Sequence, residues 1–202
     1  MGTIPEATQT HLHSNGVVAY PTSTLPGLAT LPTTEALDEL FALKKRQADQ
    51  PVSLGVATLE QASLLVEVPD FAYRLLAGFE RGSLTLILDA HSPLDPRLGG
   101  HRVAVRVFAH PQAIDLANTM GPVTATSANI AGTPPLSSAE DAGQELGLVA
   151  HAILPGNCPG GHGSTLLSVE KSEGSPMGYS VSIMREGVIP YTDVTSWMSK
   201  NH

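Results

Sequence analysis

The sequence has 202 residues, and its 11 basic and 19 acidic side chains give a formal net charge of −8. This charge argues against a protein that holds nucleic acid along its surface, because such binding needs an excess of cations facing the phosphates. Hydrophobic residues make up 42% and charged residues 15% of the chain, which excludes a disordered acidic protein, and the single cysteine excludes a disulfide framework and a cysteine-rich zinc site.

No Lys or Arg precedes Lys44, whereas a secretory signal or a mitochondrial presequence needs early basic residues. No apolar run approaches the roughly 18 residues of a membrane-spanning helix. We therefore expect a cytoplasmic protein that has no membrane partner.

The first half of the chain alternates between apolar runs and helical patterns. Residues 16–21 are a short apolar run that ends at a proline, which predicts a buried strand. A helix is predicted from Thr33 to about Lys44, because a hydroxyl residue precedes an acidic first turn and apolar residues follow at helical spacing. The same reasoning predicts strands at 52–57 and 83–89 and helices at 59–67 and 70–80.

The second half continues the alternation, with strands predicted at 103–107, 123–126, 149–154, 164–169 and 181–184, and helices at 110–119 and 138–146. Residues 191–202 are short and mostly polar and are interpreted as a terminal tail or lid. Interleaved strands and helices predict an α/β fold with a twisted, mostly mixed sheet and flanking helices. Because there is no internal repeat or low-complexity linker, one domain over residues 1–202 is expected.

The familiar nucleotide-binding glycine motifs and the hydrolase nucleophile elbow are absent. A phosphate site must therefore be assembled from scattered cations and backbone donors. The first candidate is the run Lys44-Lys45-Arg46, which leads into a polar loop closed by Pro51. The alternative is a solvated helix end, since cations at a helix C-terminus interact favourably with the helix dipole.

Residues 124–129 (TATSAN) place small hydroxyls and an amide at the end of an apolar strand. They are compatible with a simple capped turn. They are equally compatible with hydrogen bonds to an amino acid or a phosphate beyond the end of a sheet.

Arg106 lies within a strand of alternating pattern, and Arg102 is predicted on the same face because side chains repeat every two residues. A strand arginine is usually solvated or paired. Its guanidinium fork also suits a carboxylate or a phosphate.

The glycine-rich segment 160–165 (GGHGST) leads into a strand and is compatible with a plain loop or with close approach of backbone to a ligand. Cys158 and His162 lie in or beside it. They lack the further ligands of a metal site, so we favour the loop and expect no protein-bound metal.

Taken together, segments in this order resemble the YrdC/TsaC family of threonylcarbamoyl-AMP synthases, and the similarity extends over about residues 15–190. The segments that carry the resemblance are residues 20–28 (YPTSTLPGL), 43–53 (LKKRQADQPVS), 84–88 (LTLIL), 103–107 (VAVRV), 126–132 (TSANIAG), 164–165 (ST) and 184–187 (MREG).

The resemblance implies a twisted α/β sheet with a large concave cleft. It implies an enzyme that joins L-threonine, bicarbonate and ATP, with Mg²⁺, to give threonylcarbamoyl-AMP and pyrophosphate. The product serves the N6-threonylcarbamoyl modification of adenosine 37 in tRNA, which the chain would reach indirectly through downstream modification proteins.

The resemblance also implies a set of site residues. Threonine contacts are expected from Thr22, Arg106, Thr126, Ser127 and Ser164. ATP contacts are expected from Lys44, Arg46, Asn129, Ser137 and Arg185, with Gln50 and Arg102 at ATP-contact positions where the residue type differs from the family's. Lys44, Arg46 and Arg106 are the residues expected to be catalytic, because the reaction needs charge neutralisation and alignment of its substrates.

The alternative is a paralogue of the YciO type, which binds nucleotide or RNA without making the adenylate. Its motivation is that Pro26 replaces an aromatic residue and Gln50 replaces a lysine of the family pattern. A regulatory protein with a vestigial pocket is a third interpretation.

Overall fold

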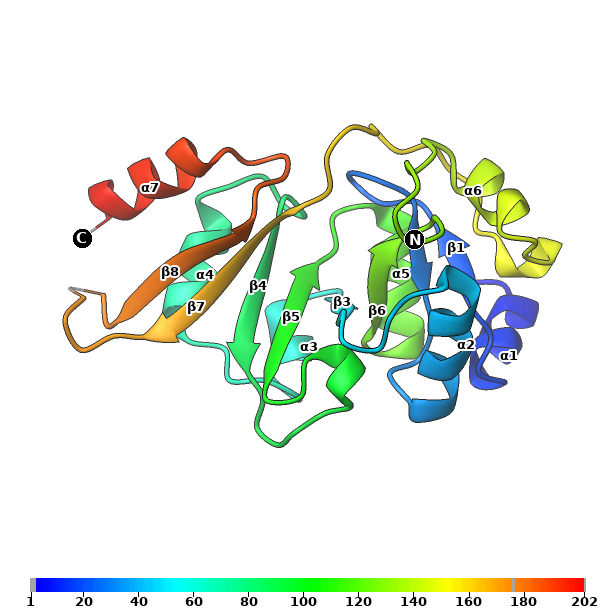
Figure 1. The fold of residues 1–202 in the computed structure, drawn as a ribbon, viewed down its shortest axis with the longest axis horizontal. Helices are drawn as coiled ribbons and strands as arrows, with labels where there is room; N and C mark the ends of the chain where they lie inside the picture. The colour runs from blue at the N-terminus through cyan, green and yellow to red at the C-terminus, as the bar shows by residue number, and fades with distance from the viewer. Residues whose placement is uncertain (1–2, 176, 202) are drawn as a thin grey trace.

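The computed structural model describes residues 3–175 and 177–201. Its centre is a mixed eight-stranded sheet in the order β1-β2-β6-β3-β5-β4-β7-β8 (Figure 1). The pairs β3–β5 and β4–β7 are parallel and the other neighbouring pairs are antiparallel, which confirms the predicted α/β class. The strands are β1 Val18–Tyr20, β2 Gly27–Ala29, β3 Ser53–Val56, β4 Leu84–Asp89, β5 Arg102–Val107, β6 Val123–Ser127, β7 Thr165–Lys171 and β8 Tyr179–Arg185.

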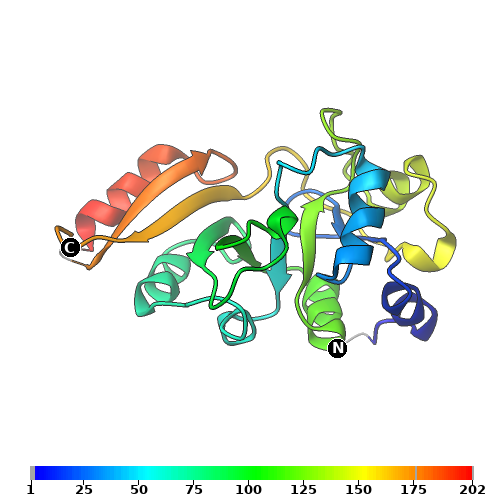
Figure 2. The same ribbon diagram turned by 60° about the horizontal axis from the view of Figure 1, so that its bottom comes forward.

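The helices divide into three groups around this sheet. Helices α3, α4 and α5 lie together on one side of it, α1, α2 and α6 gather near β1, and α7 lies beside β8 at the opposite end (Figures 1 and 2). Their bounds are α1 Glu6–His13, α2 Thr34–Lys44, α3 Leu59–Ala62, α4 Asp70–Ala77, α5 Pro111–Met120, α6 Ala139–Glu145 and α7 Tyr191–Lys200.

The buried apolar side chains form two clusters. The larger packs α2 and α4 against the sheet and contains Leu40, Phe71 and Leu86. The smaller joins α1 and α5 to β1 and contains Tyr20 and Leu116. Burial of these faces is the main favourable contribution to folding.

Helix α2 has the predicted bounds, and its two ends explain why. The Thr33 side chain accepts a hydrogen bond from the Ala36 backbone N–H, which satisfies a donor of the first turn. At the other end Lys45 adopts a left-handed conformation with φ 50°, and the Arg46 N–H bonds back to the Phe41 carbonyl. This turn separates Arg46 from the helix and directs the chain toward the open face of the sheet.

Two predictions of local structure are wrong. Residues 149–154 are not a strand: Ala150–Ala152 is a 3₁₀ turn, and only Ile153 forms an isolated bridge, with Ala19. The helix predicted at 59–67 ends at Ala62. In both cases a short segment takes its conformation from tertiary packing, which its periodicity does not contain. The terminal segment interpreted as a tail or lid contains α7, whose Val194 is buried.

Helices α1 and α7 and strand β2 were not predicted. Helix α1 buries Thr8 and Leu12, and β2 pairs with both β1 and β6. Residues around β2 had the composition of a loop, but Gly27 allows the Tyr20 ring to lie against the strand, since a Cβ there would lie 2.6 Å from that ring.

In the described part of the chain, none of the helices combines the length and the apolar character that crossing a membrane requires.

Candidate functional site

A cleft of about 550 Å³ opens on the face of the sheet formed by alternate residues of β4 and β5. Thr85, Ile87 and Ala104 line it, whereas Leu86 and Val105 between them are buried in the larger core cluster. The alternation of the strands therefore separates the cleft from the core. The cleft was expected from the family resemblance, and the strands place it where the polar motifs converge.

Four guanidinium groups line this cleft, from Arg46, Arg102, Arg106 and Arg185. Among the described residues that line it, Glu186 is the only carboxylate. A cleft of this charge attracts anions such as carboxylates and phosphates, even though the whole chain carries a net charge of −8.

Arg106 projects from β5 and is held by neutral acceptors. Its Nε donates to the Gly82 carbonyl at 3.0 Å, and its Nη2 donates to Thr24 Oγ1 at 2.8 Å and Ser23 Oγ at 3.4 Å. Within the described chain no carboxylate lies at ion-pair distance from it. Burial lowers the pKa of Arg106 from its ordinary value, which is the expected cost of an unpaired buried cation. Its charge is thus available to an anion in the cleft.

Hydroxyl groups surround the cleft near Arg106. Thr22 Oγ1 donates to the Leu25 carbonyl at 2.7 Å and accepts from the Thr24 N–H at 3.0 Å, so its position is fixed by its own loop. Ser164 Oγ lies 2.7 Å from Thr85 Oγ1 at the start of β7. Thr22 and Ser164, both predicted to contact substrate, line the cleft as buried residues.

The loop that follows β6 forms another wall. Thr126 and Ser127, which were predicted to contact threonine, line the cleft. Asn129 does not line it: its Nδ2 donates to the carbonyls of Ile130 at 2.9 Å and Thr133 at 2.6 Å. Its Oδ1 is buried without a hydrogen-bond partner in the described structure, so this acceptor is free for a donor.

Lys44 is not among the residues that line the cleft. The residue is 1% exposed, and its Nζ donates to the Ser127 carbonyl and, at 2.6 Å, to the Asn129 carbonyl. Burial, with the nearby Arg46 charge, lowers the pKa of Lys44 to about 8. The structure therefore places this side chain beneath the loop of Ser127 and Asn129, where it fixes two carbonyls.

Arg46 and Arg185 approach the cleft from elements far apart in the sequence. Arg46 donates to the carbonyls of Gln50 at 2.6 Å and Pro51 at 3.0 Å, so its loop folds around its own guanidinium. Arg185 donates to the Ser164 carbonyl at 2.9 Å. Burial and the charge of Arg185 both lower the pKa of Arg46, as expected for two cations that share a site.

The remaining predicted ATP contacts differ in their placement. Arg102 lines the cleft on the same side as Arg106, as predicted, but it forms an ion pair with Asp89 at 2.7 Å and donates to Ser168 at 2.8 Å. Gln50 and Ser137 are exposed and do not line the cleft. The side chains of Gln50 and Ser137 therefore lie outside the group of residues that line the cleft.

Apart from His162, five polar residues that line the cleft were not among the predicted site residues: Tyr20, Thr24, Ser53, Thr85 and Glu186. Thr24 belongs to the hydroxyl-rich loop after β1, and Thr85 alternates with Ile87 on the cleft face of β4. The strand periodicity therefore contained a signal for Thr85, whereas Thr24 was recognisable only through its contact with Arg106.

No cluster of three or more His, Cys, Asp or Glu residues suited to a metal ion occurs in residues 3–175 and 177–201. Cys158 is buried and accepts a hydrogen bond from the Thr22 N–H at 3.3 Å, while His162 lines the cleft.

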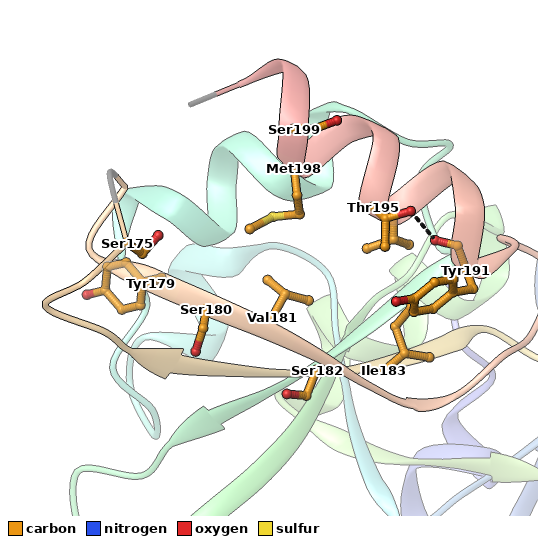
Figure 3. Close-up of a pocket in the computed structure, with 11 residues that line it drawn as sticks. Ser175, Tyr179, Ser180, Val181, Ser182, Ile183, Tyr191, Thr195, Met198 and Ser199 are labelled. Carbon is orange, nitrogen blue, oxygen red and sulfur yellow. Dashed lines mark hydrogen bonds between the residues drawn. The ribbon is translucent and has the colours of Figure 1, made fainter.

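A second hollow of about 580 Å³ lies between β8 and α7, and we call it the β8–α7 groove. Figure 3 shows Val181 and Ile183 pointing from β8 toward α7, which contributes Tyr191 and Met198. The other lining residues are Ser175, Tyr179, Ser180, Ser182, Val194, Thr195 and Ser199. None of these described side chains is Asp, Glu, Lys or Arg, so they provide no charged group with which to hold an anion.

Known proteins share this sequence pattern. A threonylcarbamoyl-AMP synthase of Bacillus subtilis is 37% identical over 164 residues, which are 78% of this chain and 47% of the relative. One of Stenotrophomonas maltophilia is 34% identical over 156 residues, 74% of this chain and 84% of the relative. The chain spans about half the length of the B. subtilis synthase and of a Pyrococcus abyssi synthase that it also matches.

Solved structures share the fold. The crystal structure of P. abyssi Sua5 complexed with L-threonine superposes with a TM-score of 0.74 at 30% identity, covering 93% of this chain and 55% of that chain. Escherichia coli YciO, at 20% identity, superposes with a TM-score of 0.70 over 93% of this chain and 92% of that chain, a likeness of fold alone.

The family model that matches residues 10–187 is that of the Sua5, YciO and YrdC proteins, described as telomere recombination. The match covers most of the chain and includes the residues that line the cleft. This chain belongs to the Sua5/YciO/YrdC family.

Proposed function

We propose that this protein is an L-threonylcarbamoyladenylate synthase, which makes threonylcarbamoyl-AMP and pyrophosphate from L-threonine, bicarbonate and ATP. The observation that carries the proposal is the unpaired Arg106, set among hydroxyls in a cleft that also holds Arg46 and Arg185. Further support comes from relatives of 31–37% identity that are named threonylcarbamoyl-AMP synthases. The proposal assigns the activity to a single domain of residues 1–202, and none of the described residues 191–201 lines the cleft.

The threonine substrate is assigned to the part of the cleft around Arg106. The guanidinium would hold the α-carboxylate, because a charge-assisted bond is the strongest available there. The hydroxyls of Thr22 and Ser164, with Thr126 and Ser127 across the cleft, offer donors and acceptors for the amine and the side-chain hydroxyl. A structure of P. abyssi Sua5 was solved in complex with L-threonine, which supports threonine as the substrate.

ATP is assigned to the neighbouring part of the cleft. Arg46 and Arg185 would neutralise the triphosphate, and Arg102, already paired with Asp89, would contribute at the far end. Asn129 does not line the cleft, so a bond from its unpartnered Oδ1 to the nucleoside would need the loop after β6 to move. Lys44 would hold the loop after β6 in place through its bonds to the Ser127 and Asn129 carbonyls. Contacts from Gln50 or Ser137 would need these exposed side chains to move.

The reaction divides into two steps. The threonine amine, once deprotonated, attacks the carbon of bicarbonate, and loss of water leaves a carbamate. A carbamate oxygen then attacks the α-phosphorus of ATP, and the bond to the β-phosphate breaks as pyrophosphate leaves. Arg46, Arg106 and Arg185 assist by aligning two anions that repel each other and by neutralising the charge on the leaving group.

Magnesium fits this site only as an ion bound to the phosphates of the nucleotide. The cleft presents guanidinium groups and one lining carboxylate, Glu186, which already accepts a hydrogen bond from the Tyr191 N–H at 2.8 Å. Mg²⁺ prefers oxygen ligands and usually binds through substrate phosphates and water. When bound it would stabilise the charge of the departing pyrophosphate.

The product is a mixed anhydride that carries an activated threonylcarbamoyl group. We propose that downstream proteins in the cytoplasm transfer this group to N6 of adenosine 37 in tRNA, so that the chain reaches tRNA indirectly. The acidic net charge supports indirect access to tRNA, because direct binding of a polyanion would need a basic surface.

A pyrophosphate-release assay tests the proposal. Purified protein with ATP and Mg²⁺ should release pyrophosphate only when threonine and bicarbonate are both present. Binding of ATP and threonine without release would contradict the synthase and support the YciO-type alternative. Titration with RNA at two salt concentrations completes the test, since strongly salt-sensitive RNA binding that threonine does not affect would indicate a nucleic-acid-binding module.

A further inference from the structure

Arg81 lies in the loop before β4 and joins that loop to the ends of two other strands. Its Nε donates to the Phe108 carbonyl at 2.7 Å, and its Nη2 donates to the Ala57 carbonyl at 2.6 Å. These carbonyls come directly after the paired ends of β5 and β3. One exposed side chain therefore fixes the loop against the carboxyl ends of two parallel strands.

The next residue, Gly82, is the acceptor that orients Arg106. Its carbonyl receives the Arg106 Nε–H at 3.0 Å, and its φ of +82° is a conformation that favours glycine. A Cβ at Gly82 would lie 2.5 Å from Ser23 Oγ and 3.0 Å from the Ala109 Cβ. The loop is thus wedged between the Ser23 loop and the end of β5, so a shift of the loop moves the acceptor of Arg106.

The orientation of Arg106 depends on geometry because no protein charge holds it. Its acceptors are the Gly82 carbonyl and two hydroxyls, Thr24 Oγ1 and Ser23 Oγ. A hydroxyl rotates, whereas a carbonyl fixed in a loop does not. The Gly82 carbonyl therefore fixes the orientation of the Arg106 guanidinium plane. Arg81 in turn anchors the loop that carries this carbonyl.

We propose that Arg81 is a positioning residue for Arg106: by anchoring the Gly82 carbonyl, it pre-organises the guanidinium that receives the amino-acid carboxylate. The identity of that carboxylate rests on the proposed function, but the effect of Arg81 on Arg106 does not. Because Arg81 is exposed, truncating its side chain leaves no cavity in the core.

Two measurements test the proposal on Arg81→Ala and Arg81→Lys. The first is the Arg106 Nε–Hε signal in NMR spectra of ¹⁵N-arginine-labelled protein, which reports the bond to Gly82 without any substrate. The second is calorimetric titration with threonine and, separately, with ATP. A matched control is Gln61→Ala, because Gln61 also makes two hydrogen bonds to backbone, with the Ala57 N–H and the Ala117 carbonyl at 2.8 Å each, but none to the Gly82 loop.

Arg81→Ala should shift the Nε–Hε signal and speed its exchange with water, and it should weaken threonine binding about tenfold, the combined effect of two net hydrogen bonds. ATP affinity should stay within about twofold. Arg81→Lys, which places one donor instead of a fork, should fall between wild type and Arg81→Ala. Gln61→Ala should leave both the signal and threonine binding unchanged.

An unchanged Nε–Hε signal in Arg81→Ala would overturn the inference, as would equal effects of Arg81→Ala and Gln61→Ala on threonine binding. If the wild type binds no threonine while the signal still shifts in Arg81→Ala, the positioning of Arg106 stands and the proposed function fails. The two failures are therefore distinguishable.

Discussion

The cleft and the β8–α7 groove are hollows of similar volume, about 550 and 580 Å³, at different places on one sheet. Four guanidinium groups line the cleft, whereas the described residues that line the groove are apolar or carry hydroxyl groups (Figure 3). Volume therefore does not distinguish a candidate active site here. What distinguishes it is fixed positive charge with neutral partners, because such charge is costly to bury and is retained where an anion binds.

The two regions also differ in what holds them together. In the cleft, backbone carbonyls hold cations: Gly82 accepts from Arg106, Gln50 from Arg46 and Ser164 from Arg185. Near the groove, α7 is held by aromatic packing, with the Trp197 ring 6.2 Å from that of Phe71 and 6.3 Å from that of Phe79. Substitutions in the cleft should therefore affect ligand binding, and substitutions near α7 should affect stability.

The largest expected effect is on activity. Arg106→Ala should lower kcat/KM for threonine by about 10²–10³-fold, because it removes the cation assigned to the carboxylate. Steady-state pyrophosphate release measures this, with thermal unfolding as the control for folding. A rate close to that of the wild type would show that the cleft has been assigned the wrong role.

The next effect is on stability alone. Trp197→Ala should lower the free energy of unfolding by about 2–3 kcal/mol, since it removes aromatic packing against α4. Urea denaturation gives this number, and activity per folded molecule should stay at the wild-type level. A loss of threonine affinity without a loss of stability would remove the distinction between the two regions.

A further prediction concerns the titration of Lys44, which lies beneath the loop that forms one wall of the cleft. NMR of the side chain should give a pKa of about 8, and Arg46→Ala should raise it, because the Arg46 charge is one of the two causes of the depression. An unchanged pKa in Arg46→Ala would contradict the proximity of these cations.

The same shift makes stability depend on pH. Between pH 8 and the ordinary lysine pKa of 10.5 the unfolded chain binds the proton that folded Lys44 has released. The stability of the wild type relative to Lys44→Met should therefore rise with pH across this window. Denaturation at several pH values measures the difference, and a falling difference would show that the two carbonyl contacts hold the proton on Lys44 more strongly than burial removes it.

The smallest effect is expected at the groove surface. Tyr191 is 56% exposed, so Tyr191→Ala should change stability by less than about 0.5 kcal/mol and leave ATP and threonine binding intact. Calorimetry and urea denaturation check both. A large loss of ATP or threonine affinity would show that the β8–α7 groove contributes to ligand binding.

Much of the fold was predictable because its strongest elements carry their signals locally. Helix α2 has a hydroxyl cap, apolar spacing and a basic end, and β5 alternates clearly, so both occur where predicted. Strand β2 was missed because it is defined by partners far along the chain, in β6. Residues 149–154 were misassigned because a short apolar run suits a strand and a buried turn equally.

The site was predictable in its residue types but not in every placement. Arg46, Arg106, Arg185, Thr22 and Ser164 line the cleft. Lys44 belongs to the same motif as Arg46, but its Nζ contacts the carbonyls of Ser127 and Asn129, more than 80 residues away in the sequence. A motif specifies type and spacing, whereas the direction of a flexible side chain depends on tertiary acceptors that the motif does not contain.

The most direct test of the central claim is to look for the product. Wild-type protein, ATP, Mg²⁺, L-threonine and ¹³C-bicarbonate should yield threonylcarbamoyl-AMP that carries the ¹³C label, detected by mass spectrometry, and Arg106→Ala should yield almost none. An absence of the labelled adenylate with the folded wild type, or equal yields from both proteins, would contradict the account.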